Sequence, residues 1–122
     1  MDTYSQGTGW LRRGGSLIGI GYSGCGEGLN NTECQDEPNL GPCPQGVWIL
    51  GEPFDSPKHG PYCIPLTPAE GTNTFGRSEF LVHGDSIEHA GEYLASRGCV
   101  ILRRSVRHLL REGGDGQLTV IP

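Results

Sequence analysis

The sequence has no hydrophobic run that approaches the ~20 residues of a membrane-spanning helix, so we expect no membrane insertion. Basic residues are also few, since 9 Lys and Arg stand against 14 Asp and Glu, for a net charge of −5. Nucleic-acid binders usually carry a basic surface, so this charge argues against nucleic acid as a partner. The opening stretch, MDTYSQGTGW, lacks the basic and apolar regions of a signal peptide. We therefore expect any function outside the cytoplasm to need another export route.

Apolar residues are scarce as well, at 34% of 122 residues, whereas the chain holds 21 glycines and 9 prolines. The glycines are scattered among Trp, Tyr, Ile, Leu and Val. Because Gly and Pro serve turns with special backbone angles, this composition predicts a compact β-rich fold with many turns. The length predicts a single domain over residues 1–122.

The five cysteines show no Cys-x₂₋₄-Cys spacing, which common structural zinc sites use. Four lie in the loop-rich part of the chain, and Cys99 stands apart. We expect two disulfides among the first four, with pairing that the sequence does not determine, and a free thiol at Cys99. Five reduced thiols or a zinc site are the alternatives. The first four cysteines are Cys25, Cys34, Cys43 and Cys63.

Short apolar patterns bounded by turn residues predict the strands. Two strands are expected within residues 9–24, joined at Gly14-Gly15, and others at 46–50, 78–84, 99–102 and 117–121. In the 78–84 strand, the alternation places Leu81 and His83 on the face opposite Phe80 and Val82. Residues 24–45 read as a long loop. The five prolines of residues 52–73 argue against a long helix or a central strand there.

One helix is predicted near the C-terminus, over residues 103–114, and a helical turn within 86–98. The helix has an apolar stripe of Val106, Leu109 and Leu110. Its basic face consists of Arg103, Arg107 and Arg111. That face is most simply solvated, and a grip on carboxylates of an acidic partner is the alternative. The expected fold class is therefore mostly β with one short C-terminal helix.

Cys99 and His83 are the residues that could carry chemistry. Most free cysteines are small buried hydrophobes, and a lone histidine at a strand end is more often structural. However, Cys99 follows the polar and flexible Ser96, Arg97 and Gly98, where backbone N–H groups could form an oxyanion hole. A thiol needs a partner that takes its proton, and His83 could be that base.

Two further readings involve the same residues. His83, Asp85 and His89, with Cys99, could ligate a metal ion, although H-x-D-x₃-H is not a recognised metal spacing. Ser86 or Ser96 could be a nucleophile, but no G-x-S-x-G elbow surrounds either one. Neither reading has a supporting motif, and no metal or cofactor is expected.

A longer set of motifs resembles a known family. A histidine, a spacer, and then Ser-x-Gly-Cys followed by an apolar residue is similar to the signature of L,D-transpeptidases of the YkuD type. The blocks GYSGCGEGLNN, PNLGPCPQGVWILGEP, DSPKHGPYCIPLTP and FGRSEFLVHGDS resemble the small L,D-transpeptidase-like effectors of type VI secretion, whose relatives also occur in prophages. This likeness runs from about Gly21 to the C-terminus.

The resemblance implies roles for individual residues. Cys99 would be the nucleophile and His83 its base, while the Ser96 backbone would orient the histidine. Gly98 and the Cys99 amide would help to hold the oxyanion. Arg97 would contact a substrate carboxylate and Asp85 would be supportive. The residues that would shape the cleft are Tyr22, Ser23, Phe75 and Arg77.

The implied reaction removes the terminal D-alanine of peptidoglycan stem tetrapeptides, or exchanges it for another D-amino acid. The resemblance also implies injection into the periplasm of a target cell, a secretion-apparatus component as partner, and a cognate immunity protein. Cysteines at 25, 34, 43 and 63 are not part of the family pattern, so disulfides formed in the periplasm are an expectation of our own.

Three other functions remain open at this point. A papain-like hydrolase is disfavoured because those enzymes usually place the cysteine before the histidine. A non-catalytic, disulfide-stapled binding module from a prophage or a secreted protein would tolerate the loss of Cys99. A secreted zinc-binding domain would contain metal.

Overall fold

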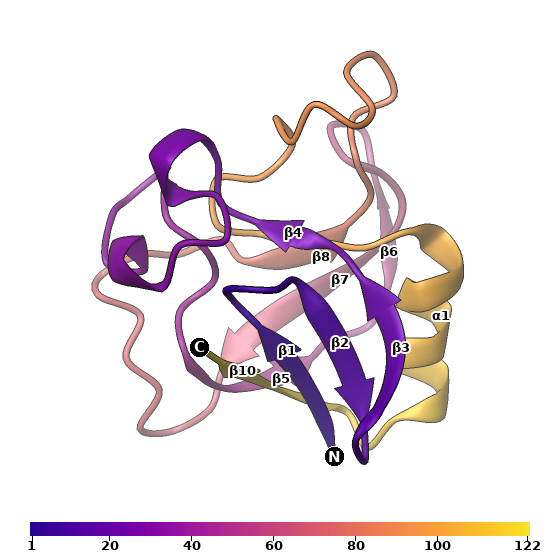
Figure 1. Cartoon of the computed structure of the whole chain (residues 1–122). Helices are drawn as coiled ribbons and strands as arrows, with labels where there is room; N and C mark the ends of the chain where they lie inside the picture. Colours follow the sequence, from indigo (N-terminus) through magenta and orange to yellow (C-terminus); the bar gives the residue numbers. More distant parts are fainter.

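The computed structural model describes residues 1–122, and its dominant element is a ten-stranded sheet (Figure 1). The strands are β1 (Asp2–Ser5), β2 (Trp10–Arg13), β3 (Ser16–Ile20), β4 (Tyr22–Ser23), β5 (Gly46–Leu50), β6 (Phe54–Ser56), β7 (Gly60–Pro68), β8 (Leu81–His83), β9 (Val100–Ile101) and β10 (Gln117–Ile121). The helices are η1 (Gly26–Gly28), η2 (Thr32–Cys34) and α1 (Arg104–Gly113), of which only α1 is an α-helix. The expected fold class, mostly β with one short C-terminal helix, is confirmed.

The sheet curls so that its two edge strands meet. The strand order is β3-β2-β1-β10-β5-β7-β8-β9-β4, with β6 paired to β7. β3 and β4 stand at opposite ends of this order, yet only Gly21 separates them along the chain. A Cβ at Gly21 would lie 1.8 Å from the Ile101 carbonyl oxygen, and a Cβ at Gly9 would lie 1.9 Å from the Gly21 carbonyl oxygen. Glycine at these two positions therefore permits the close crossing between the edges.

The core consists of alternate strand residues and one face of α1. Trp48, Val82 and Val100 belong to one buried cluster, together with Val106 and Leu110 of the helix. The helix packs against β3, β7 and β8, and Figure 1 shows it beside β3. No helix of the structure has the length and apolar character needed to cross a membrane.

Most of the expected elements are present. The hairpin of β2 and β3, the strands β5, β9 and β10, and the helix α1 confirm the predictions. β8 is shorter than expected, but its alternation is confirmed, because Phe80 and Val82 face the core while Leu81 and His83 face a cleft. The predicted helical turn is wrong, since residues 86–98 contain turns and no helix, and the sequence patterns missed β1.

The proline-rich segment was wrongly excluded from the sheet, since it forms β6 and the nine-residue central strand β7. Pro65 is tolerated because it lies opposite Gly51, where the partner of β7 changes from β5 to β6. The Gly51 N–H donates to the Pro65 carbonyl oxygen. The Gly51 carbonyl oxygen, which an N–H at residue 65 would have reached, accepts from the Arg111 guanidinium instead (2.9 Å).

The prediction of a solvated arginine face holds for Arg103, which is exposed, and is wrong for the other two arginines. Arg107 is only 4% exposed, and its guanidinium donates to the carbonyl oxygens of Leu102, Pro61 and Tyr62. Arg111 is half-buried and donates to Gly51 and Glu52. These two side chains therefore bind the helix to the sheet, which leaves neither of them free to grip an acidic partner.

All five cysteines are free thiols, which contradicts the two predicted disulfides. Cys43 and Cys63 are fully buried, so the fold uses them as small core residues. Cys25 and Cys34 donate to backbone carbonyl oxygens of the loop that contains them. The loop is held by other bonds, described below.

Candidate active site

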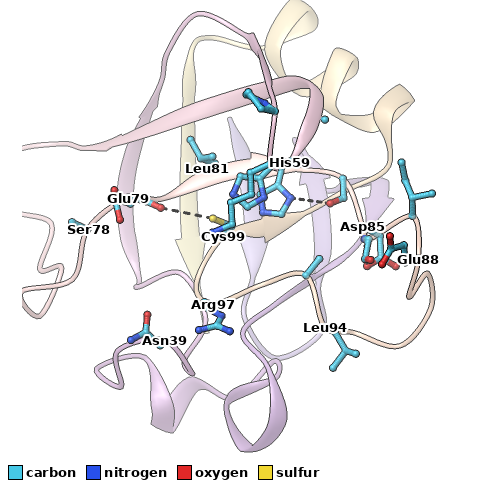
Figure 2. A pocket seen from close by; sticks show the side chains of 18 residues that line it. Asn39, His59, Ser78, Glu79, Leu81, Asp85, Glu88, Leu94, Arg97 and Cys99 are labelled. Carbon is cyan, nitrogen blue, oxygen red and sulfur yellow. Dashed lines mark hydrogen bonds between the residues drawn. The ribbon is translucent and has the colours of Figure 1, made fainter.

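A cleft of about 1170 Å³ lies beside β8 and the residues that lead into β9 (Figure 2). Its walls come from the β6–β7 turn (57–60), from residues around β8 (78–86), and from residues 94–99. Cys99 and His83 both line this cleft. The structure therefore brings together the two residues that the sequence singled out.

Strand register explains why Cys99 and His83 share a face. β8 and β9 are parallel, with Val82 opposite Val100 and His83 opposite Ile101. Because Val82 and Val100 point into the core, the residues before and after them point to the other face. Cys99 is thus a diagonal neighbour of His83, at a separation of roughly 7–8 Å between such positions. Side chains at that separation can meet in front of the sheet.

The His83 ring is fixed in one tautomer. Its Nδ1 lies 2.8 Å from the Gly84 carbonyl oxygen, which can only accept, so Nδ1 carries the proton. Nε2 is then the basic nitrogen, and it is buried without a hydrogen-bond partner. The ring is also stacked on the His59 ring, with centroids 4.1 Å apart and an interplanar angle of 24°.

Burial keeps His83 neutral. The side chain is 1% exposed, and this desolvation lowers its pKa to about 4, with smaller effects from the Gly84 carbonyl, which opposes the shift, and from His59 and Arg107, which add to it. At neutral pH the imidazole is therefore ready to accept a proton rather than to give one.

Cys99 rests as a neutral thiol. Burial raises its pKa, although the Leu81 N–H, which bonds the sulfur, acts in the opposite direction. The thiol donates to the Glu79 carbonyl oxygen, with 3.8 Å between Sγ and O (Figure 2). It makes no hydrogen bond to His83, so the resting pair is a neutral thiol beside a neutral imidazole.

Ser96 holds the turn before Cys99 and does not touch His83. Its hydroxyl is fully buried, donates to the Cys99 carbonyl oxygen, and accepts from the N–H groups of Gly24 and Gly98. The expected role of its backbone in orienting the histidine is therefore wrong, since Gly84 provides that carbonyl. These bonds also leave Ser96 no freedom to act as a nucleophile.

Gly98 adopts a backbone angle that suits only glycine, with φ +131°. A Cβ there would lie 2.5 Å from the Arg77 guanidinium. Its N–H is bound to Ser96, whereas the Cys99 N–H is in no hydrogen bond of the structure. The Cys99 amide is thus the available donor of the two that were expected to hold an oxyanion.

Tyr22 and Ser23 hold the segments that form the wall of the cleft around Cys99. The Ser23 hydroxyl lies within hydrogen-bond distance of the Gly98 and Cys99 carbonyl oxygens (3.2 and 3.0 Å). The Tyr22 hydroxyl donates to Asp85 and accepts from the Ala95 N–H. These residues hold the chain that carries Cys99, and neither lines the cleft.

Arg77 is a backbone clamp rather than a cleft residue. Its buried guanidinium donates to the carbonyl oxygens of Gln35, Gly41, Pro42 and Arg97. It therefore connects the long loop after β4 to the residue two positions before Cys99. Arg97 itself is exposed and lines the cleft, whereas Phe75 is exposed on a turn outside it.

The residues that could have ligated a metal ion do not form a metal site. Asp85 accepts from Tyr22 and from the Ser86 and Gly91 N–H groups, so it closes its own loop. His89 pairs with Glu92 instead of Asp85. No group of three or more His, Cys, Asp and Glu side chains is arranged to hold a metal ion, which contradicts the metal-ligand reading of His83, Asp85 and His89.

Sequence reasoning missed the β6–β7 turn as part of the site. Pro57, Lys58, His59 and Gly60 all line the cleft. The available signal was a histidine and a lysine between Pro57 and Gly60, because such a tight turn projects its side chains outward.

Comparison with known protein families agrees with this geometry. The family model of the Tlde1 domain matches residues 19–114, a range that includes every residue of the cleft. Among curated proteins the chain has no match. The matching family is one of type VI secretion effectors with L,D-transpeptidase-like character, as the sequence resemblance implied. The chain belongs to the Tlde1 domain family.

Proposed function

We propose that the protein is a cysteine acyl transferase of the L,D-transpeptidase type, with a YkuD-like catalytic domain, that acts on peptidoglycan stem tetrapeptides. The observation that carries the proposal is the placement of Cys99 and His83 on one face of β8 and the entry to β9, within a single cleft. The Gly84 carbonyl adds support, because it makes Nε2 of His83 the proton acceptor.

The reaction begins when the Cys99 thiol leaves the Glu79 carbonyl and attacks the carbonyl carbon between the third stem residue and D-alanine. Nε2 of His83 takes the thiol proton as the C–S bond forms. The imidazolium then protonates the nitrogen of D-alanine as the C–N bond breaks. D-alanine leaves, and a thioester remains on Cys99.

The thioester is resolved by water or by the amine of a D-amino acid. His83 removes a proton from the attacking group, and the Cys99 thiolate leaves and recovers a proton. Water yields a tripeptide, which is carboxypeptidase action, whereas an amine yields an exchanged tetrapeptide. The Cys99 N–H donates to the oxyanion of both tetrahedral intermediates. Arg97, exposed at the cleft, contacts a substrate carboxylate.

As an antibacterial effector, the protein would reach the periplasm of a target cell through the type VI apparatus. A component of that apparatus and a cognate immunity protein are the partners that this role requires. Loss of D-alanine deprives the target wall of donors for normal crosslinks.

The test is to incubate the purified protein with a stem tetrapeptide, with and without D-methionine, and to analyse the products by mass spectrometry. We expect loss of D-alanine, or its replacement by D-methionine, at a rate that falls by at least about 10³-fold in Cys99→Ala. Cys25→Ala is the matched control, because Cys25 lies outside the cleft, and it should keep full activity. Intact substrate with the folded wild-type protein would contradict the proposal.

A further inference from the structure

The β6–β7 turn brings a second imidazole to the base. We propose that His59 is a positioning residue for His83: its ring covers the face of the His83 ring and holds it where Nδ1 meets the Gly84 carbonyl. This inference rests on the proposed function for its kinetic consequence, but its structural part can be measured without a substrate.

The contact between the rings is extensive and specific. The centroids are 4.1 Å apart and the planes are inclined by only 24°, so the two rings lie face to face. A histidine held by a single hydrogen bond could still rotate about that bond. A second ring against its face removes this freedom and keeps water away from Nε2, which is buried and unpartnered.

The turn that carries His59 is itself held firmly. The Ser56 hydroxyl accepts the N–H groups of both Lys58 and His59. Directly after the turn, the buried Arg107 guanidinium donates to the carbonyl oxygens of Pro61 and Tyr62. These bonds hold the turn in one conformation, which a positioned ring requires.

Arg107 also lies against Gly84, the residue whose carbonyl oxygen bonds Nδ1 of His83. It donates to the Leu102 carbonyl oxygen, and a Cβ added at Gly84 would lie 3.0 Å from its guanidinium. One buried side chain thus braces both the turn that carries His59 and the residue whose carbonyl fixes His83. Arg107 therefore supports the positions of both imidazole rings.

The charges around the rings favour two neutral imidazoles. The charged and titratable groups that face His83 are Arg107 from α1, Asp85 from its own loop, His59 and Lys58 from the β6–β7 turn, and Cys99 from the entry to β9. Burial and Lys58 lower the pKa of His59 as well. When His83 accepts a proton from Cys99, the His59 ring remains stacked on it and keeps it in place.

The experiment follows the His83 imidazole by ¹⁵N NMR in the full-length protein, in His59→Ala and in His59→Phe. Without a ring over it, His83 gains water, so we expect its pKa to rise by about one pH unit in His59→Ala and its single tautomer to become a mixture. Phe keeps the ring contact and should restore the single tautomer. His89→Ala, which removes an exposed histidine outside the cleft, is the control and should change nothing.

On a stem tetrapeptide, the same variants separate positioning from binding. We expect kcat to fall roughly 10–100-fold in His59→Ala with little change in KM, and to recover in His59→Phe. A His83 titration and tautomer unchanged in His59→Ala would overturn the inference, as would a Phe variant as impaired as the Ala variant. The wild type and all variants could fail to act on the peptide while the His83 pKa and tautomer still change in His59→Ala. In that case the proposed function fails and the positioning role of His59 stands.

Discussion

The strand pair under the cleft and the irregular segment of residues 84–98 beside it hold their side chains by different means. β8 and β9 are fixed by backbone pairing and by the buried Val82 and Val100. The 84–98 segment has no helix or strand, and it is fixed by hydrogen bonds of polar side chains, some from elsewhere in the chain and some its own. The Cys99–His83 pair spans both regions, because His83 ends a strand and Cys99 follows the irregular segment directly.

Four side chains hold the two ends of this segment. Tyr22 binds its two ends through Asp85 and Ala95, Ser23 and Ser96 bind the backbone at Gly98 and Cys99, and Arg77 binds the Arg97 carbonyl oxygen. All four side chains are buried. Polar side chains thus take the place of ladder hydrogen bonds where the chain turns sharply before Cys99.

The largest effect should follow from removal of the Arg77 clamp. Arg77→Met leaves four backbone carbonyl oxygens without their charged donor, so we expect a loss of roughly 3 kcal/mol in the free energy of unfolding. Urea denaturation measures this loss. Arg104→Met changes an exposed arginine and should cost little. Equal stability of the two variants would show that the segment does not depend on Arg77.

A comparable loss in the free energy of unfolding is expected at low pH, and it arises from His83 at the end of β8. The folded protein keeps His83 neutral down to a pKa of about 4, whereas an unfolded histidine takes a proton near pH 6.5. The contribution of neutral His83 to the free energy of unfolding is therefore complete above pH 6.5. It falls by about 3 kcal/mol as the pH drops toward 4. The measurement is the unfolding free energy against pH for the wild type and for His83→Gln. Parallel pH curves for the two proteins would contradict this account.

A smaller effect should follow from Ser96→Ala, which removes one hydroxyl from the turn before Cys99. The N–H groups of Gly24 and Gly98 then lack an acceptor, and we expect a loss of about 1–2 kcal/mol. Alkylation of Cys99 by iodoacetamide, followed by peptide mass spectrometry, should also change in rate, because the backbone of Cys99 loses its hydrogen bond from the Ser96 hydroxyl. Ser105→Ala on the exposed part of α1 is the matched control. Similar alkylation rates in both variants would show that Ser96 does not support Cys99.

The difference between the two regions also explains what the sequence could predict. Strands such as β5 and β10 follow from apolar alternation, and the helix follows from its apolar stripe and terminal glycines. The cleft face of His83 follows from the same alternation within β8. Regular periodicity therefore located the strand pair and His83.

The irregular parts could not be predicted, because their bonds join residues far apart in the chain. Pro65 fits a central strand only because Arg111 takes the carbonyl that the proline leaves unpaired, 46 positions later in the sequence. Arg107 reads as a surface residue by its spacing, but it is buried, and its guanidinium donates to the Tyr62 carbonyl oxygen, which lies 45 positions earlier in the chain. The second imidazole of the site lies in a turn 24 positions before His83, and no local pattern connects the two.

The most direct test of the Cys99–His83 account is to trap the acyl-enzyme. The protein is mixed with a stem tetrapeptide, quenched in acid within milliseconds to seconds, and examined by intact-protein mass spectrometry with peptide mapping. The account predicts an adduct of the tetrapeptide minus D-alanine on Cys99, absent in Cys99→Ala and formed far more slowly in His83→Gln. Release of D-alanine by Cys99→Ala at the wild-type rate, or an adduct on any other residue, would contradict it.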